Sequence, residues 1–223
     1  MQATKRDLLS LLAVLFDPLG LISPMLVRMK MLFQTLCCEK WDWDKELEVE
    51  SRKKFSEWVE DLSEIKGISI SQCVYENPKQ RVLEFQLHGF GDASTKAYCV
   101  VVYLVYTTNE GVNVKLLASK SRVAPVKTLT IPQLELVSAR ILAQLMETVK
   151  NALESQLEIS QTKYWLDDKT VLCWIQNRGE WKQFVRHRVN EILKLTCKKD
   201  WGHCPGEENP ADIDSRGTLG SRL

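Results

Sequence analysis

The stretch that most constrains the fold is residues 87–95, where an alternating apolar pattern ends in an aspartate that is followed by small residues. A second apolar run, residues 98–106, is rich in the β-branched and aromatic side chains that strands prefer. The two runs together predict a β-hairpin. Because Asp is disfavoured within strands, Asp92 either caps a turn or points into a site where a cation offsets the cost of its burial. The local pattern by itself favours the turn.

The chain beyond this hairpin predicts an α/β domain. A third strand is expected at residues 112–118. Thr130 and Gln133 then form a capping box at the start of a long amphipathic helix. A fourth strand at residues 162–166, further helices and a last strand at residues 201–204 follow. This order of elements predicts a mixed sheet, with three antiparallel strands and then parallel additions, flanked by helices.

The first part of the chain, residues 1–78, predicts a mainly helical segment. A capping box that starts at Thr4 precedes leucines with helical spacing, and two more helices are expected, the last of them highly charged and opening at Trp41. Turn-forming and polar residues at 77–80 indicate a linker. We therefore place a domain boundary there and expect a second domain in residues 79–223.

Composition narrows the class of protein. The chain has 223 residues, of which 44% are hydrophobic, and its net charge of +1 means that any attraction to nucleic acid must come from local patches. Its seven cysteines contain no Cys-x-x-Cys pair, which argues against a disulfide framework or a zinc ribbon and for a reducing setting. No apolar run is long enough to span a bilayer, and no signal-peptide cleavage site follows the apolar stretch near the N-terminus. We expect an intracellular, cytoplasmic protein that is not secreted.

Acidic residues lie beside the ends of the predicted elements. Asp92 ends the first strand, Glu135 lies at the start of the long helix, Asp167 follows the fourth strand and Asp212 follows the last. Carboxylates that converge at one edge of a sheet repel one another unless divalent cations neutralise them. Because ligand sets made only of oxygen suit hard cations, this pattern indicates magnesium or manganese.

Five blocks follow one another along the chain: LHGFGDAS (87–94), SKSRVAP (119–125), TIPQLEL (130–136), WLDD (165–168) and HCPGEENPAD (203–212). In this order they resemble the ribonuclease H region of BEL/Pao retrotransposon polyproteins. A further stretch near the N-terminus, FDPLGLISP at residues 16–24, resembles the segment that follows the polymerase core in those polyproteins. Five ordered blocks are far more specific than a single acidic motif, and with the N-terminal stretch the resemblance covers nearly the whole chain.

The resemblance implies a fold, a site and a reaction. It implies a ribonuclease H-like domain in residues 79–223 with a short or truncated terminal helix, preceded by a thumb- or connection-like segment. It further implies that Asp92, Glu135, Asp167 and Asp212 are catalytic and hold two ions of Mg²⁺ or Mn²⁺, one to activate water and one to stabilise the leaving 3′ oxygen. The implied reaction is endonucleolytic hydrolysis of the RNA strand of RNA–DNA hybrids during reverse transcription.

The partners implied by the resemblance are an RNA–DNA hybrid, the reverse transcriptase core and other domains of the same polyprotein. It implies no membrane partner. The implied location is the cytoplasm, including virus-like particles. Recognition of a hybrid by backbone shape and 2′-hydroxyl groups explains why no base-reading motif is visible. Basic residues on two sides of the acids are candidates for phosphate contacts. They are Lys120, Arg122 and Lys127 in one set, and Lys182, Arg186 and Arg188 in the other.

Four further residues are predicted to lie near the acids, and each has a role of its own. Asp168 stands where the family has a small hydroxyl residue, and we expect it to cap a helix rather than bind metal. Asp214 is an alternative for the fourth acid. His203 is an auxiliary candidate, either as a proton-shuttling residue or as a structural one. Ser94 is a second auxiliary candidate, because a small residue leaves room for a sugar–phosphate backbone.

Two other classes of function remain open. The chain could be a catalytically inactive retroelement remnant that binds nucleic acid or packs against a polymerase, although the presence of all four acids argues against this. It could also be a transposase or integrase on the same fold that acts on DNA. The helix glutamate between the first two aspartates, Glu135, is typical of the ribonucleases and favours them.

Overall fold

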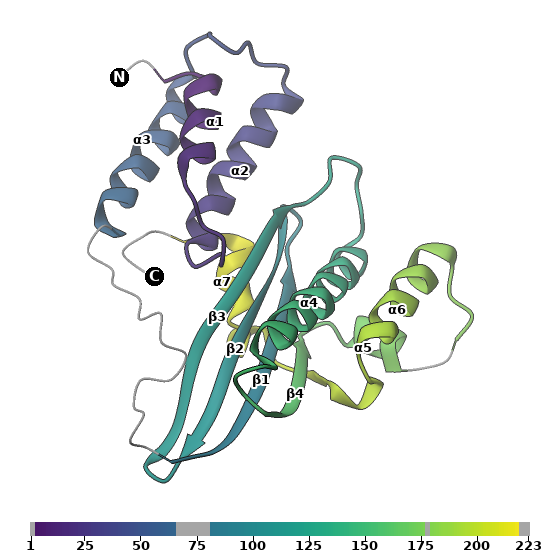
Figure 1. The fold of residues 1–223 in the computed structure, drawn as a ribbon. Helices are drawn as coiled ribbons and strands as arrows, with labels where there is room; N and C mark the ends of the chain where they lie inside the picture. The colour runs from purple at the N-terminus through teal and green to yellow at the C-terminus, as the bar shows by residue number, and fades with distance from the viewer. Residues whose placement is uncertain (1–2, 66–80, 177–178, 219–223) are drawn as a thin grey trace.

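A five-stranded mixed sheet organises the molecule, with helices on both faces and a helical N-terminal segment at one edge (Figure 1). Among the described residues, no helix is both long and apolar enough to cross a membrane. The linker expected at residues 77–80, and the domain boundary within it, lie outside the described part. The computed structural model describes residues 3–65, 81–176 and 179–218, without the side chains of Glu64 and Asp214.

The sheet has the strand order β3-β2-β1-β4-β5. Two turns join β1, β2 and β3 as antiparallel neighbours, whereas β4 runs parallel to β1 and β5 runs parallel to β4. This topology confirms the predicted mixed sheet. Asp92 lies within β1 rather than in the hairpin turn, so the local expectation of a turn aspartate is wrong. The strands are β1 (Val82–Ala93), β2 (Ala97–Thr108), β3 (Gly111–Val123), β4 (Ile159–Leu166) and β5 (Trp201–His203).

Helices cover the two faces of the sheet unequally. The long helix α4 packs on one face together with α5 and α6, and the short helix α7 packs against β1 and β2 on the other. The first three helices form the N-terminal segment around a hydrophobic cluster of their own. The helices are α1 (Lys5–Val14), α2 (Ser23–Cys38), α3 (Val49–Glu64), α4 (Ile131–Leu153), α5 (Lys169–Gln176), α6 (Gln183–Leu195) and α7 (Ala211–Arg216).

Strand β2 is buried on both faces. Val100, Val102 and Leu104 belong to the cluster that α4 covers, whereas Cys99 and Val101 belong to the cluster on the α7 face. Successive side chains of a strand point to opposite faces, so a strand that is covered on both sides needs apolar residues at every position. This explains the uninterrupted apolar run in the sequence of β2.

Two glycines of β1 allow α4 to approach the sheet closely. A Cβ atom at Gly89 would lie 2.7 Å from Leu142 Cδ1, and one at Gly91 would lie 2.9 Å from Ser138 Oγ. Any larger side chain at these positions would push the helix away from the strand. The close approach brings the start of α4, which carries Glu135, towards the end of β1.

The N-terminal segment departs from its predicted helices at one place. The third helix begins at Val49, so the expected start at Trp41 is wrong. The chain before Val49 instead bonds to the beginning of the molecule, where the Leu47 amide donates to the Ala3 carbonyl at 2.8 Å. This long-range hydrogen bond helps to hold the stretch in a non-helical form, which local helix propensity does not predict.

The N-terminal segment docks on β3, which is the edge strand of the sheet. Ser119 donates twice across this junction, from its amide to the Leu19 carbonyl at 2.7 Å and from its hydroxyl to the Gly20 carbonyl at 2.7 Å. The Ser23 hydroxyl donates to the Ser121 hydroxyl at 2.6 Å in a buried contact. These bonds satisfy polar groups that an uncovered edge strand would expose.

Candidate metal centre

Three of the four predicted acids converge where β1 and β4 end. Asp92 is the last residue but one of β1, Asp167 directly follows β4, and Glu135 lies near the N-terminus of α4. Because β1 and β4 are parallel and pair Gly91 with Leu166, their carboxyl ends meet at the same edge of the sheet. One carboxylate oxygen from each acid lies within 4.8 Å of the others.

These three carboxyl groups are largely removed from water. Asp92 is 4% exposed and Glu135 is 2% exposed, while Asp167 is partly buried. Glu135 Oε1 accepts a hydrogen bond from the Ala93 amide at 2.7 Å. Glu135 Oε2 and Asp167 Oδ1 are buried and have no hydrogen-bond partner among the described residues. Orphaned buried oxygens are costly unless something binds them, and a cation would bind both.

Burial and mutual repulsion make the charged forms of these acids unfavourable. Burial, together with the charges of Asp167 and Asp92, raises the pKa of Glu135 to about 10. Burial also raises the pKa of Asp92 to about 6, and it raises the pKa of Asp167 above its ordinary value. A divalent cation reverses this effect because it stabilises the charged carboxylates. A donor set made only of oxygen therefore fits Mg²⁺ or Mn²⁺.

The fourth predicted acid, Asp212, lies outside this group of three. It is the second residue of α7, and its Oδ1 pairs with Arg216 Nε at 2.8 Å. Its charge is nevertheless one of the lesser causes that raise the pKa values of Asp92 and Asp167, which places it near the cluster. The side chain of the alternative acid, Asp214, lies outside what the structure describes.

Two buried polar residues beside the acids were not predicted from the sequence. The fully buried Ser215 donates its hydroxyl to Asp92 Oδ2. Asn209, which is 4% exposed, donates its side-chain amide to the Gly91 carbonyl at 2.9 Å. Both hold α7 against the end of β1. Asn209 lies within one of the blocks that carry the family resemblance, whereas Ser215 offers no signal except its spacing of one helical turn from Asp212.

Asp168 has a different role from its neighbour Asp167. Its Oδ1 accepts hydrogen bonds from the amides of Thr170 at 2.6 Å and Val171 at 3.1 Å, at the start of α5. This geometry confirms the prediction that Asp168 caps a helix. The cap fixes the turn in which Asp167 leaves the strand, so one acid of the pair orders the chain that carries the other.

The two auxiliary candidates lie at the rim of the site. Ser94 is in the turn between β1 and β2, where its hydroxyl accepts from the Ala97 amide at 3.1 Å and lies 3.1 Å from the Ser215 carbonyl. His203 is exposed at the end of β5. Their roles in a reaction stay predictions.

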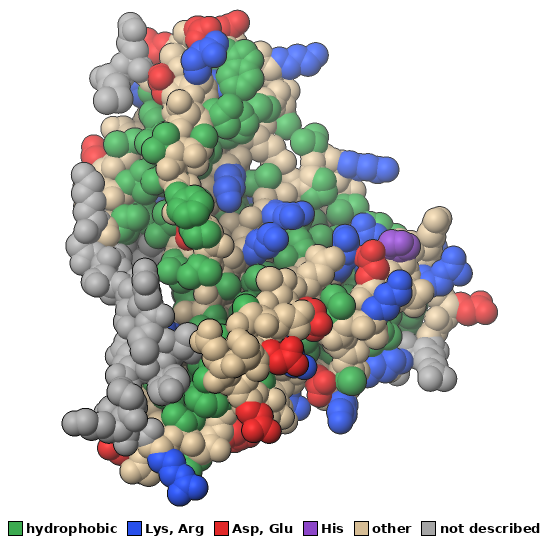
Figure 2. Space-filling view, in the orientation of Figure 1, with side chains coloured by type: hydrophobic (Ala, Val, Ile, Leu, Met, Phe, Trp, Pro, Cys, Tyr) green, Lys and Arg blue, Asp and Glu red, His purple; other side chains and the backbone are tan. Residues whose placement is uncertain are grey.

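The first set of basic residues lies beside the N-terminal segment. Lys120 and Arg122 are exposed on β3, and Lys127 is exposed in the loop before α4. With Lys30, the first two line a groove of about 480 Å³ between the N-terminal segment, β3 and α4. Figure 2 shows lysine and arginine side chains gathered where these elements meet. The strand register places this end of β3 two strands away from Asp92, which is roughly 10 Å across the sheet, perpendicular to the strands.

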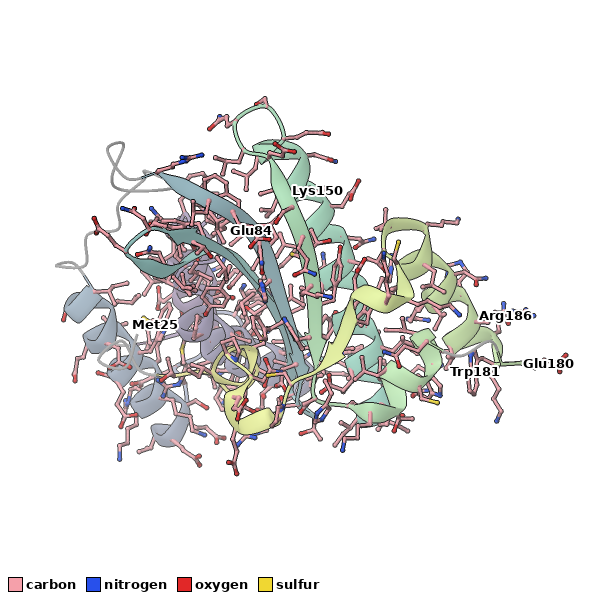
Figure 3. All side chains as sticks on the ribbon, turned by 90° about the horizontal axis from the view of Figure 1, so that it is seen from below. Met25, Glu84, Lys150, Glu180, Trp181 and Arg186 are labelled. Carbon is pink, nitrogen blue, oxygen red and sulfur yellow. The ribbon has the colours of Figure 1, made fainter. Side chains whose placement is uncertain are left out.

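The second set of basic residues belongs to α6 and the residue before it. Lys182 and Arg186 are exposed, and Figure 3 shows Arg186 on the outer side of the helix, away from the sheet. Arg188 is partly buried instead. Its guanidinium lies 3.5 Å from the centre of the Phe184 ring and donates to the Phe184 carbonyl at 3.0 Å. The side chain of Arg188 therefore packs on its own helix in this structure.

The strand order and the acid cluster define a ribonuclease H-like domain. The chain belongs to the family described as Pao retrotransposon-like RNaseH-like domain, whose model matches residues 4–168. This match confirms the resemblance to BEL/Pao retrotransposon sequences. It spans the helical N-terminal segment as well as the sheet up to Asp168, and so includes three of the four predicted acids.

Solved structures resemble this chain at low sequence identity and low TM-score. The ribonuclease H1 of the halophilic archaeon Halobacterium salinarum is 14% identical, with 59% of this chain and 91% of that chain covered and a TM-score of 0.35. The foamy viral protease-reverse transcriptase in complex with RNA/DNA hybrid is 16% identical, with 90% of this chain and 24% of that chain covered and a TM-score of 0.45. No curated protein sequence matches this chain. The class therefore rests on the strand order and the family match.

Proposed function

We propose that this chain is a retrotransposon ribonuclease H that hydrolyses the RNA strand of RNA–DNA hybrids in a metal-dependent reaction during reverse transcription. The observation that carries the proposal is the cluster of Asp92, Glu135 and Asp167, whose ligand oxygens lie within 4.8 Å of one another. It is the one group of three or more potential metal-binding side chains among the described residues. Two of its oxygens are buried and have no hydrogen-bond partner among the described residues, as expected of oxygens that bind a cation.

In this proposal the three clustered acids hold two divalent ions, and Asp212 joins them as a fourth ligand after leaving its ion pair with Arg216. When bound, the ions supply an activated water and stabilise the leaving 3′ oxygen. The residues of the chain supply the geometry. The Ala93 amide anchors one oxygen of Glu135 and leaves the other without a protein partner. The walls of β1 and α4 keep bulk water from the buried carboxylates.

The substrate class follows from the family and from the basic groove. In this proposal Lys120, Arg122 and Lys127 contact phosphates of a duplex that crosses the end of the sheet near Asp92, and Arg186 is a more distant contact. Such contacts set affinity and position without reading bases. Recognition by backbone shape and 2′-hydroxyl groups then distinguishes the RNA strand from the DNA strand.

The partners and location in this proposal are those of a retrotransposon polymerase. The reverse transcriptase core and other domains of the same polyprotein are the expected neighbours, in the cytoplasm and in virus-like particles. The inactive remnant is the second candidate, favoured by the separation of Asp212 from the other three acids.

A cleavage assay tests the proposed function. With Mg²⁺, the wild type should cut the RNA of an end-labelled RNA–DNA hybrid and leave double-stranded DNA intact, whereas Asp92→Asn should abolish cutting because it removes a charged ligand. Asp42→Asn, at an exposed aspartate of the N-terminal segment, is the matched control and should cut like the wild type. Equal cutting by Asp92→Asn and the wild type would refute the metal site. Hybrid binding without metal-dependent cutting would support the remnant, and cutting of DNA alone would support a transposase-like enzyme.

A further inference from the structure

The short helix α7 lies between the acid cluster and the N-terminal segment. It packs on β1 and β2 on one side and on α2 on the other, and Figure 1 shows it next to the end of α2. A helix of six residues is too short to be stable by itself, so its position depends on these contacts. The polar contacts of α7 include a hydrogen bond to one of the clustered acids.

One residue of α7 holds Asp92. The Ser215 side chain is fully buried, and its hydroxyl donates to Asp92 Oδ2. The same hydroxyl lies 3.2 Å from the Asp212 carbonyl, but a carboxylate acceptor makes the stronger bond. The Ser215 backbone also lies against the turn between β1 and β2, where its carbonyl and the Ala97 carbonyl are both acceptors 3.1 Å from the Ser94 hydroxyl. Ser215 therefore restrains one carboxylate oxygen and orients the other.

The N-terminal segment holds the end of α7 from the opposite side. The Thr218 amide donates to the Pro24 carbonyl of α2 at 3.3 Å. Gly217 has a φ of 78°, and a Cβ atom there would lie 2.5 Å from Arg28 Cγ and 3.2 Å from the Pro24 carbonyl oxygen. Arg28 in turn pairs with Asp61 of α3 at 3.3 Å. The end of α7 is thus seated against α2 with no space for a side chain.

We infer that Ser215 is a positioning residue that fixes the Asp92 carboxylate for metal binding, and that α2 holds Ser215 in place through the end of α7. The N-terminal segment is then a part of the metal site rather than only a link to a polymerase. This inference rests on the proposed function and deepens it. It names a residue beyond the four acids and gives the helical segment a role in the nuclease.

The affinity for Mn²⁺, measured by electron paramagnetic resonance or calorimetry, tests the role of Ser215. Ser215→Ala should weaken Mn²⁺ binding by about 10–100-fold, the usual effect of losing a residue that orients a ligand. Ser138→Ala is the matched control, because Ser138 is also fully buried near the site but donates to the Cys99 carbonyl and to no acid. A merely structural role would lower metal-free stability alike in both variants and leave both affinities unchanged.

A second pair of variants tests the support from α2. Gly217→Ala should weaken Mn²⁺ binding several-fold, because the added Cβ pushes α7 away from Arg28 and Pro24. Gly111→Ala is the control, since Gly111 also has a positive φ but no atom within 4 Å of the added Cβ. Gly111→Ala should lower the free energy of unfolding through backbone strain but keep the Mn²⁺ affinity of the wild type.

The outcomes distinguish the role of Ser215 from the support that α2 gives to α7. Wild-type affinity in Ser215→Ala overturns the positioning role, and wild-type affinity in Gly217→Ala overturns the support from α2. If Ser215→Ala does not fold, Ser215→Cys takes its place with the same expectation, because a thiol is a similar shape but a much weaker donor. Absence of Mn²⁺ binding in the wild type would overturn the proposed function itself.

Discussion

Glu135 bears the largest electrostatic cost in the candidate site. It is 2% exposed, and burial together with two neighbouring aspartates raises its pKa to about 10. At neutral pH and without a cation, Glu135 is therefore protonated, and its Oε1 still accepts from the Ala93 amide. Metal binding must release this proton, so affinity for the metal should rise with pH.

The same pKa shifts predict how metal-free stability depends on pH. An acid whose pKa is raised by folding binds more protons in the folded state, so the free energy of unfolding falls as the pH rises. The loss runs from the ordinary pKa of 3.8 to about 6 for Asp92 and from 4.5 to about 10 for Glu135. Urea unfolding in EDTA should therefore show lower stability at about pH 8 than at about pH 5.

Two variants test whether Glu135 causes this pH dependence of the free energy of unfolding. Glu135→Gln has nearly the same shape and cannot ionise, so its stability should fall less between the two pH values. Glu147→Gln, on the same helix but outside the cluster, should keep the wild-type slope. The same slope in Glu135→Gln as in the wild type would contradict the raised pKa of Glu135.

The ends of the elements decide which acids reach the site. Strand β4 ends at Leu166, so Asp167 leaves the sheet beside Asp92, and the next residue, Asp168, turns to the amides of α5. Two adjacent carboxylates thus have separate roles because they form the short link between the end of β4 and the start of α5. The glycines of β1 have a comparable effect, because they let the start of α4 come close enough for Glu135 to reach the Ala93 amide.

Substitution of the adjacent aspartates should separate stability from metal binding. Asp168→Ala should lower the free energy of unfolding by about 0.5–2 kcal/mol through loss of the helix cap, with Mn²⁺ affinity largely kept. Asp167→Asn should instead weaken Mn²⁺ binding and largely keep the free energy of unfolding. Asp168→Ser, which retains a capping oxygen, should restore most of the stability. If Asp168→Ala lost metal binding as completely as Asp167→Asn, Asp168 would be a ligand after all.

At the scale of the whole molecule, the described part of the N-terminal segment contacts both the edge of the sheet and the helix beside the acids. It docks on the edge strand β3 through Ser119 and Ser121, and it holds the end of α7 through α2. The basic groove lies at the first junction and the candidate metal centre lies beyond the second. The two parts keep separate hydrophobic clusters, and the hydrogen bonds to Ser119 and Ser121 connect them.

Gly20 tests the junction with β3. A Cβ atom there would lie 2.0 Å from the Ser119 carbonyl oxygen, and its φ of 74° is strained for other residues. Gly20→Ala should lower the free energy of unfolding by more than about 2 kcal/mol, measured by urea titration. Gly111→Ala carries a positive φ without a clash and should cost less. Equal losses in the two variants would mean that the segment does not dock on β3.

Much of the fold is determined by the sequence alone, because short-range interactions set it. The capping boxes at Thr4 and Thr130, the hairpin of the first two strands and the cap at Asp168 all involve residues that are two to four positions apart or alternate along a strand. The order of the four acids, together with the family blocks, also came from the sequence. These features require no knowledge of the tertiary structure.

Only the tertiary structure decided how those parts meet. The bond from the Ala93 amide to Glu135 spans 42 residues, and the bond from Ser215 to Asp92 spans 123. Burial, and with it the raised pKa values, depends on the packing of all elements around the site, so no local pattern gives it. For the same reason the structure, and not the sequence, separated Asp212 from the other acids and made Ser215 a neighbour of Asp92.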